Sequence, residues 1–283
     1  MGKPHDRCPL CGGTSSTPHP HYVKHHLLRC AACGFHYSGI EPGHEELLAF
    51  YSNYPMPERL SPVTAARYDE LLAALEPFRK NGRLLDMGCG AGMFLDRARA
   101  AGWEVYGTEY PDKVVARCRE KGIVMHQGSV TEHPWPAGHF DVAVTFEVIE
   151  HDLRAMTALL RPGGALYVTT PNFNSVSRWI LGGRWNVVWY PEHLSYFTPR
   201  VMHRTLVSLG MERLTIHTTG VSLHRINRST GKPSTVNGLD ADEDLRRRIE
   251  VKWHLRAAKA TVNAALNLFK RGDTIKALYR KRT

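Results

Sequence analysis

The chain has 283 residues, of which 42% are hydrophobic and 23% are charged. This composition is typical of a globular protein and excludes a disordered or collagen-like chain. The length suits one large domain with a small one and excludes three or more full domains. Neither a run of about 18 apolar residues nor the apolar core of a signal peptide is found, so we expect a cytoplasmic protein.

The formal net charge of +10 is concentrated near the C-terminus. Residues 221–283 carry 15 basic and 6 acidic side chains, whereas the chain before them is nearly neutral. Within this region, residues 240–271 place apolar side chains at helical spacing opposite arginines and lysines, which predicts a basic amphipathic segment. We favour packing of its apolar face on the body of the protein. The alternative is that the segment contacts the inner face of an anionic membrane peripherally.

Four of the six cysteines form two Cys-x-x-Cys pairs, Cys8 with Cys11 and Cys30 with Cys33. The separation of the two pairs, by the segment 12–29, is that of a zinc ribbon. Glycine follows each pair, which lets the backbone turn so that both thiolates face one tetrahedral ion. A structural zinc ion is therefore expected in a domain over residues 1–40, and disulfides are disfavoured without a secretory signal. The histidines between the pairs are interpreted as solvated hairpin residues.

The predicted elements after the ribbon begin with a helical extension over residues 41–80, interrupted by prolines. Short apolar runs then alternate with helical stretches, which is typical of a parallel sheet with crossover helices. The predicted strands cover residues 83–87, 103–109, 122–126, 140–146, 165–170 and 211–218. The predicted helices cover residues 93–101, 112–121, 152–161 and 200–209. Residues 273–283 contain an alternating stretch, 273–282, which predicts an edge strand closing the sheet. Residues 221–272 would then be a basic helical insertion into a core domain over residues 81–220.

A glycine-rich turn follows the first predicted strand of the sheet, at residues 86–92 (DMGCGAG). Glycines at positions 88, 90 and 92 let the backbone approach a ligand where side chains would collide. The next strand ends in Glu109, where a carboxylate can bind both hydroxyls of a ribose. Several nucleotide-binding chemistries use such a turn, and the simpler interpretation of Glu109 is a surface glutamate.

The charge of Asp86, which precedes the first glycine, narrows the choice of ligand. A carboxylate at this position would repel the pyrophosphate of a dinucleotide. It suits a ligand that carries an ammonium and a sulfonium group, as S-adenosylmethionine does. The predicted cofactor is therefore S-adenosylmethionine.

These residues resemble the class I S-adenosylmethionine-dependent methyltransferases. The similarity is greatest to ubiquinone-biosynthesis O-methyltransferases and to zinc-ribbon methyltransferases of polysaccharide and natural-product pathways. It runs from CPLCGG through LDMGCGAGMFL, GTEY, FDVAVTFEVIEH, LRPGGALYVTTPN and PEHLSYFTP to the closing strand, nearly the whole chain. The resemblance implies a Rossmann-like α/β fold, with helices on both faces of a seven-stranded sheet of order 3-2-1-4-5-7-6, preceded by a zinc ribbon.

The resemblance also implies where the cofactor lies. Residues 86–92 would surround its methionine part, Glu109 its ribose, and residues 128–130 its adenine. The segment 160–164 would be the loop before strand five, and two residues at the end of strand four would lie beneath the sulfonium. The implied cofactor-binding residues are Asp86, Gly88, Gly90, Gly92, Glu109, Tyr110, Ser129, Val130, Phe146 and Glu147.

Two histidines are candidates for activating the methyl acceptor. Transfer to a hydroxyl requires removal of its proton, and imidazole has a suitable pKa near neutrality. His151 follows strand four at the carboxyl edge of the sheet, and His193 lies in the PEHLSYF stretch. Glu150 would orient the imidazole, or Glu147, Glu150 and His151 would together hold a divalent ion. In the alternative interpretation, the two glutamates cap the following helix and His151 packs there.

Aromatic residues are frequent in residues 172–199, where Arg178 and Arg184 are interleaved with them. An aromatic surface of this kind can stack on a sugar or phenol ring and exclude water, which predicts a lid over the acceptor. The alternative is an ordinary hydrophobic core.

The sequence thus predicts a methyltransferase that modifies a hydroxyl of a small molecule, namely a sugar, a glycolipid intermediate or a phenolic compound. An RNA methyltransferase that uses the ribbon and the basic segment is the first alternative. It is disfavoured because TFEVIEH lacks both an Asn/Asp-Pro-Pro-aromatic stretch and an attacking cysteine. The second alternative is a scaffold that binds the cofactor without catalysis, against which the intact glycine turn argues.

Overall fold

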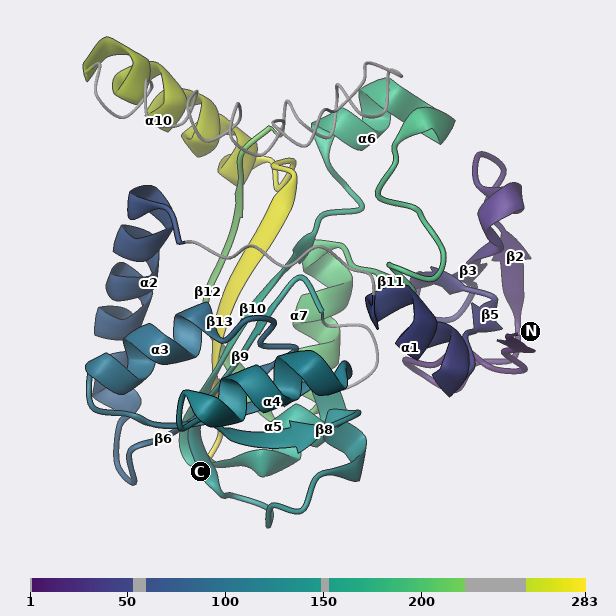
Figure 1. The fold of residues 1–283 in the computed structure, drawn as a ribbon. Coiled ribbons are helices and arrows are strands. Elements are labelled where there is room, and N and C mark those ends of the chain that lie inside the picture. The colour runs from purple at the N-terminus through teal and green to yellow at the C-terminus, as the bar shows by residue number, and fades with distance from the viewer. Residues whose placement is uncertain (1, 53–59, 149–152, 222–252) are drawn as a thin grey trace.

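The computed structural model describes residues 2–52, 60–148, 153–221 and 253–283. They form a small N-terminal part and a larger part with a seven-stranded sheet (Figure 1). Among these residues no helix is long and apolar enough to cross a bilayer.

The N-terminal part carries the four cysteines and consists of antiparallel strands in two small sheets, of which β1 and β5 form one. Its elements are β1 Lys3–Pro4, β2 Ser16–Pro18, the 3-10 helix η1 Val23–His25, β3 Leu27–Cys30, β4 His36–Ser38 and β5 Ile40–Glu41. The strands β2, β3 and β4 pair in order, and a strand from far along the chain, β11 (Ser195–Tyr196), adds to the free edge of β4. The ribbon sheet therefore includes residues of the larger part.

Two helices connect the ribbon to the large sheet: α1 His44–Ser52 and α2 Pro62–Leu75. The start of α2 is fixed by Ser61, whose side chain accepts a hydrogen bond from the backbone N–H of Thr64, with Pro62 in the first turn. A 3-10 helix, η2 Glu76–Phe78, follows directly. The predicted helical extension thus consists of two helices, with residues 53–59 between them outside the described residues.

The larger part alternates strands and helices as predicted. Its strands are β6 Arg83–Met87, β7 Glu104–Glu109, β8 Val124–Gln127, β9 Phe140–Phe146, β10 Leu160–Pro171, β12 Met211–Thr219 and β13 Thr274–Lys281. Its helices are α3 Met93–Ala100, α4 Asp112–Glu120, η3 Val130–Glu132, α5 Leu153–Leu159, α6 Val176–Leu181, η4 Gly182–Arg184, α7 Pro199–Ser208 and α10 Trp253–Leu268. The sheet order is β8-β7-β6-β9-β10-β13-β12, which confirms the expected 3-2-1-4-5-7-6.

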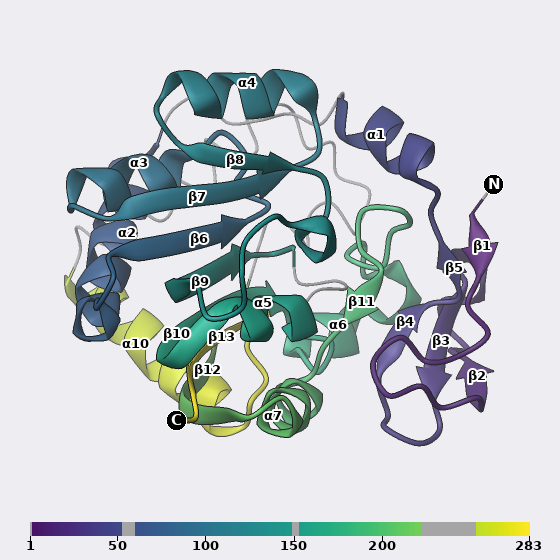
Figure 2. The ribbon, with the colours of Figure 1, turned by 90° about the horizontal axis from the view of Figure 1, so that it is seen from below.

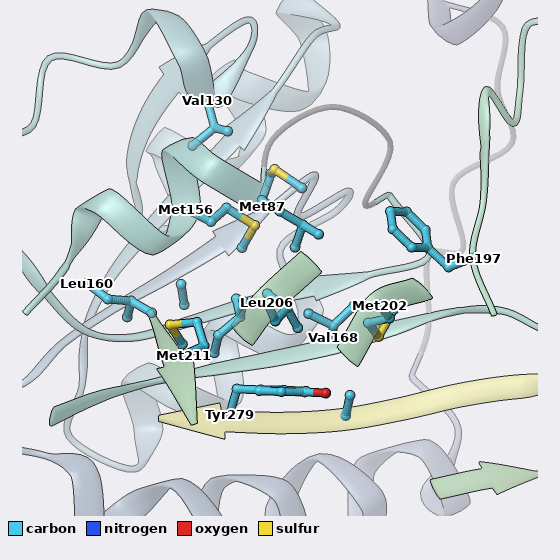
Figure 3. Close-up of a cluster of buried hydrophobic side chains, with 14 of the residues drawn as sticks. Met87, Val130, Met156, Leu160, Val168, Phe197, Met202, Leu206, Met211 and Tyr279 are labelled. Atoms are coloured by element: carbon cyan, nitrogen blue, oxygen red, sulfur yellow. The ribbon is translucent and has the colours of Figure 1, made fainter. Parts of the chain in front are cut away.

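Helices cover both faces of this sheet (Figure 2). Successive residues of a strand point to opposite sides, so neighbouring residues of its central strands pack against helices on different faces. Leu84 belongs to a buried cluster with α2, α3 and α4, whereas its neighbour Leu85 belongs to a second cluster with α5 and α7. Figure 3 shows part of the second cluster, in which Met156 of α5 and Leu206 of α7 pack toward β10 and β13. The central strands are therefore buried on both sides.

Two details of the prediction are wrong. The closing strand β13 is not at the edge, because it lies between β10 and β12 and pairs antiparallel with both. Its polar residues alternate with the buried Ile275, Ala277 and Tyr279, so they mark one face of the strand rather than an unpaired edge. Residues 160–164 are also not a separate loop. The strand β10 already begins at Leu160, which pairs with Phe140, and a shift in register before Ala165 absorbs the Pro-Gly-Gly stretch.

A buried carboxylate on β9 holds the segment directly before β6 in place. Asp141 of β9 accepts hydrogen bonds through Oδ2 from the backbone N–H groups of Lys80, Asn81 and Gly82, and through Oδ1 from Nε of Arg161. Burial acts to raise the pKa of Asp141, but Arg161 and the three N–H groups outweigh this effect and hold the pKa below its usual value.

Replacing Asp141 with asparagine should lower the free energy of unfolding by about 3–5 kcal/mol, because it leaves the partly buried Arg161 without its counter-charge. Since the folded pKa of Asp141 is depressed, this contribution is present above its unfolded pKa and disappears as the pH falls through the folded value. Urea unfolding at neutral and acidic pH measures both effects. The matched control is Glu104→Gln, which removes the exposed ion pair with Arg83 and should cost about 1 kcal/mol or less.

Candidate cofactor and metal sites

The glycine turn connects the end of β6 to the start of α3. Gly88, Gly90 and Gly92 all have positive φ angles, of 68°, 52° and 72°. A Cβ atom on Gly88 would lie 2.8 Å from the side chain of Val148, which follows β9. Glycine is thus required at position 88 by conformation and by space, and the turn leaves its backbone uncovered by side chains of its own.

Glu109 at the end of β7 is tied to this turn. Its Oε2 accepts a hydrogen bond of 3.0 Å from the N–H of Gly90, and its Oε1 accepts one of 3.0 Å from the N–H of Tyr110. The side chain is buried, which raises its pKa against the opposing effect of the two N–H groups. The interpretation of Glu109 as an ordinary surface residue is therefore wrong.

Asp86 at the end of β6 is buried, with an exposed fraction of 1%. Its Oδ1 has no hydrogen-bond partner among the described residues. Burial, and next the nearby charge of Glu109, raise the pKa of Asp86 well above its usual value. A buried carboxyl oxygen without a donor is costly, so a positively charged or donating group at this point would stabilise it. The ammonium group of S-adenosylmethionine is such a group, and the residues present fit this cofactor.

The other predicted cofactor residues follow the ends of the neighbouring strands. After β8, the N–H of Gly128 donates to the carbonyl of Glu109, Ser129 caps η3, and Val130 is buried. At the end of β9, the ring of Phe146 packs on Phe94 with centroids 5.1 Å apart. Glu147 has a φ of 64°, and its N–H donates to the carbonyl of Thr169 on β10. These residues therefore gather at the carboxyl edge of the sheet, where ligands bind in such folds.

Two tyrosines at this edge were not predicted. Tyr68 of α2 packs on Phe94 and Phe146, and burial followed by the charge of Asp86 raises its pKa to about 12. Tyr51 of α1 lies parallel to Tyr110, with ring centroids 6.3 Å apart and an interplanar angle of 12°. Both lie in the predicted helical extension over residues 41–80, but no local pattern shows which strand end a helix will reach.

Of the two candidate bases, His193 lies among the described residues. Glu150 and His151 lie outside the described residues. His193 is half-buried, its N–H donates to the carbonyl of Trp189, and its carbonyl accepts a hydrogen bond of 2.6 Å from the hydroxyl of Tyr196. The backbone of His193 is therefore fixed, and its catalytic role stays a prediction.

The four ribbon cysteines come together in one cluster. Their Sγ atoms all lie within 4.8 Å of one another, with 3.8 Å between Cys8 and Cys33 and 3.6 Å between Cys11 and Cys30. Tetrahedral zinc with Zn–S bonds of about 2.3 Å requires sulfurs about 3.8 Å apart, so the arrangement is consistent with a zinc ribbon. The histidines between the pairs are only partly solvated: His21 and His26 are exposed and His19 and His25 are half-buried.

The aromatic segment predicted as a lid packs extensively against the ribbon. Trp185 and Tyr196 are buried in a cluster with Tyr22 and Leu27 of the ribbon. The hydroxyl of Tyr22 also donates to the carbonyl of Gly182 at 2.6 Å. For these residues the interpretation as a hydrophobic core is correct, and their role over an acceptor stays a prediction.

The comparison with known families decides the identity. Residues 56–215, more than half of the chain, match the family model described as a methyltransferase domain. The chain belongs to the class I S-adenosylmethionine-dependent methyltransferases. Among similar proteins of this class is a ubiquinone biosynthesis O-methyltransferase of Cereibacter sphaeroides, 29% identical over 177 residues, which are 55% of this chain and 71% of that protein. The corresponding protein of Roseobacter denitrificans is 30% identical over the same shares.

Solved structures agree with this methyltransferase in fold. A geranyl diphosphate methyltransferase in complex with GPP and sinefungin superposes with a TM-score of 0.56 at 16% identity, over 84% of this chain and 98% of that one. The [4+2]-cyclase SpnF superposes with a TM-score of 0.54 at 17% identity, over 86% and 97%. Since the second of these proteins is a cyclase, the fold alone does not define the reaction.

Proposed function

We propose that this methyltransferase transfers a methyl group to a hydroxyl of a small molecule: a sugar, a glycolipid intermediate or a phenolic compound. The proposal that the methyl donor is S-adenosylmethionine rests on the buried Asp86, whose Oδ1 lacks a partner among the described residues. Asp86 is also close enough to Glu109 for the charge of Glu109 to affect its pKa. The proposal that the acceptor is a hydroxyl of a small molecule is supported by relatives named ubiquinone biosynthesis O-methyltransferases, which are similar over 71% of their length.

The roles of the residues follow from their chemistry. Asp86 would bind the ammonium group of the cofactor, and Glu109 would accept hydrogen bonds from the ribose hydroxyls. Both oxygens of Glu109 already accept one N–H each, but a carboxylate oxygen has a second lone pair for a hydroxyl. The sulfonium of the bound cofactor supplies the methyl group. His151, oriented by Glu150, or His193 would remove the acceptor proton, and the fixed turn would hold the reacting groups in line.

Binding and transfer assays test this proposal with the zinc-loaded full chain. Titration calorimetry with S-adenosylhomocysteine should give a one-to-one complex, and labelled methyl groups should enter members of a panel of phenols and sugars. Transfer into RNA with no transfer into the panel would favour the RNA methyltransferase instead. Cofactor binding without transfer to either class would favour the scaffold.

Replacement of the base should lower turnover more than acceptor affinity. We expect alanine at position 151 or 193 to reduce kcat by roughly 100-fold or more, because general-base catalysis typically contributes a factor of that size. Steady-state kinetics over a range of pH measures it, and the active imidazole should also disappear from the pH profile of kcat. Full turnover in both variants would mean that positioning alone suffices and that neither histidine is the base.

A further inference from the structure

Four large apolar side chains are exposed at the ends of two helices. Trp179 and Ile180 of α6 are exposed by 77% and 63%, and Leu268 and Phe269 at the end of α10 by 75% and 69%. Single exposed apolar residues are normal on soluble proteins, but two adjacent pairs of this size are not. We call these four residues the apolar end surface.

Hydrogen bonds hold the start of α6 beside the residues that follow α10. The N–H of Val176 at the start of α6 donates to the carbonyl of Arg271 at 2.9 Å. Nη1 of Arg271 in turn donates to Oδ1 of Asn174 at 2.8 Å, and the hydroxyl of Ser177 donates to the buried Asp273. Both helices lie at the same end of the molecule in Figure 1. The start of α6 and the residues after α10 are therefore neighbours, and each apolar pair lies within four residues of this contact along the chain.

In the two described segments that carry the apolar end surface, the charged side chains have one sign. Residues 171–191 and 253–272 together contain six lysines and arginines and no aspartate or glutamate. Of these, Arg184 and Arg271 are exposed beside the apolar residues in the chain. The nearest acid along the chain, Asp273, is buried. Exposed tryptophan and aliphatic side chains, flanked in these two described segments by cations without acids, are the chemistry that binds an interface of anionic lipid.

The apolar end surface lies at the carboxyl edge of the sheet. The helix α6 follows the end of β10, and α10 precedes the start of β13, where Thr274 pairs with Pro171. The carboxyl ends of β6 and β7, with Asp86 and Glu109, are at the same edge, because β6, β7, β9 and β10 are parallel. A membrane bound here would therefore lie at the edge of the sheet that carries Asp86 and Glu109 rather than at the opposite edge.

We propose that the apolar end surface docks this enzyme on an anionic lipid bilayer, so that it receives an amphiphilic acceptor whose apolar part lies in the membrane. This inference rests on the proposed function for the acceptor, whereas the docking itself rests only on Trp179, Ile180, Leu268, Phe269 and the surrounding positive charge. Trp179 and Phe269 would enter the headgroup region, and the arginines would contact lipid phosphates.

Flotation with lipid vesicles tests the docking on the zinc-loaded full chain. The protein should float with vesicles of phosphatidylcholine and phosphatidylglycerol, and poorly with phosphatidylcholine alone or at high salt. The double variants Trp179→Gln with Ile180→Ser, and Leu268→Ser with Phe269→Ser, should each weaken binding at least about 10-fold. The matched control is Val124→Ser with Leu214→Ser, which removes exposed apolar side chains from β8 and β12 and should bind as the wild type does.

Three outcomes would overturn the proposal. They are failure of the wild-type protein to float with anionic vesicles, equal flotation of the apolar variants, and a dimer in light scattering that the apolar variants dissociate. The last would assign the surface to a second copy of the chain. Calorimetry with S-adenosylhomocysteine should give wild-type affinity for every variant, which shows that each is folded. Methyl transfer to a water-soluble phenol without vesicles measures the proposed function separately from the docking.

Discussion

Replacement of Glu109 with alanine should weaken the binding of S-adenosylhomocysteine by roughly 10- to 100-fold. The carboxylate would accept hydrogen bonds from the ribose, and a hydrogen bond to a charged group contributes about 1.5–3 kcal/mol. The substitution also removes the acceptor for the N–H groups of Gly90 and Tyr110, so the glycine turn loses one of its hydrogen bonds to β7 and keeps those to Thr108. Titration calorimetry on the zinc-loaded protein measures this loss directly.

The control for this experiment is Glu104→Ala at the opposite end of the same strand. Glu104 is half-exposed and pairs with Arg83, away from the turn, so its removal should leave the affinity unchanged. A Glu109→Ala protein that binds as tightly as the wild type would place the ribose elsewhere. It would also leave the resemblance of residues 86–109 to the cofactor site without a functional meaning.

Replacement of Cys30 with serine should have the largest effect on the fold. Its Sγ is buried and lies 3.6 Å from that of Cys11, so a serine would leave a zinc ion with three thiolates. Structural zinc contributes folding free energy of about 10–16 kcal/mol in small zinc domains. We expect loss of bound zinc and an additional unfolding transition at low temperature, measured by metal analysis and differential scanning calorimetry.

The buried Cys118 on α4 provides the matched control, because it is a thiol of the larger part of the protein, outside the metal cluster. Cys118→Ala should keep the full zinc content and lower stability only modestly, as for the loss of one small buried group. Wild-type protein that binds no zinc, or a Cys30→Ser protein with unchanged zinc content, would contradict the zinc ribbon.

Much of the fold could be predicted because it is encoded locally. The strands at 83–87 and 140–146 were predicted to the residue, since each is a short apolar run ended by a turn or a polar group. The position of β13 inside the sheet could not be predicted from its polar residues. Strand polarity reports the exposure of a face, whereas the neighbours of a strand depend on where distant parts of the chain pack.

The candidate site likewise contains residues that the sequence predicts and residues that only the structure identifies. Asp86, the glycines and Glu109 all lie in the short segment 86–109, and their spacing alone placed them at two adjacent strand ends. Tyr51 reaches Tyr110 from a helix that lies far before it in the sequence, and Tyr68 approaches Asp86 from another helix. Nothing local distinguishes these tyrosines from other residues of an apolar helix face, so only the packed structure identifies them.

Because β4 pairs with β11, the cysteine-bearing sheet is not complete within the N-terminal segment of the chain. Ser195 and Tyr196 complete the edge of the cysteine-bearing sheet, and the N–H of Ser38 donates to the carbonyl of Leu194. During translation the cysteine-bearing segment leaves the ribosome long before its last strand is made. An excised N-terminal fragment would expose an unpaired strand edge, and exchange between homologues would have to transfer both segments together.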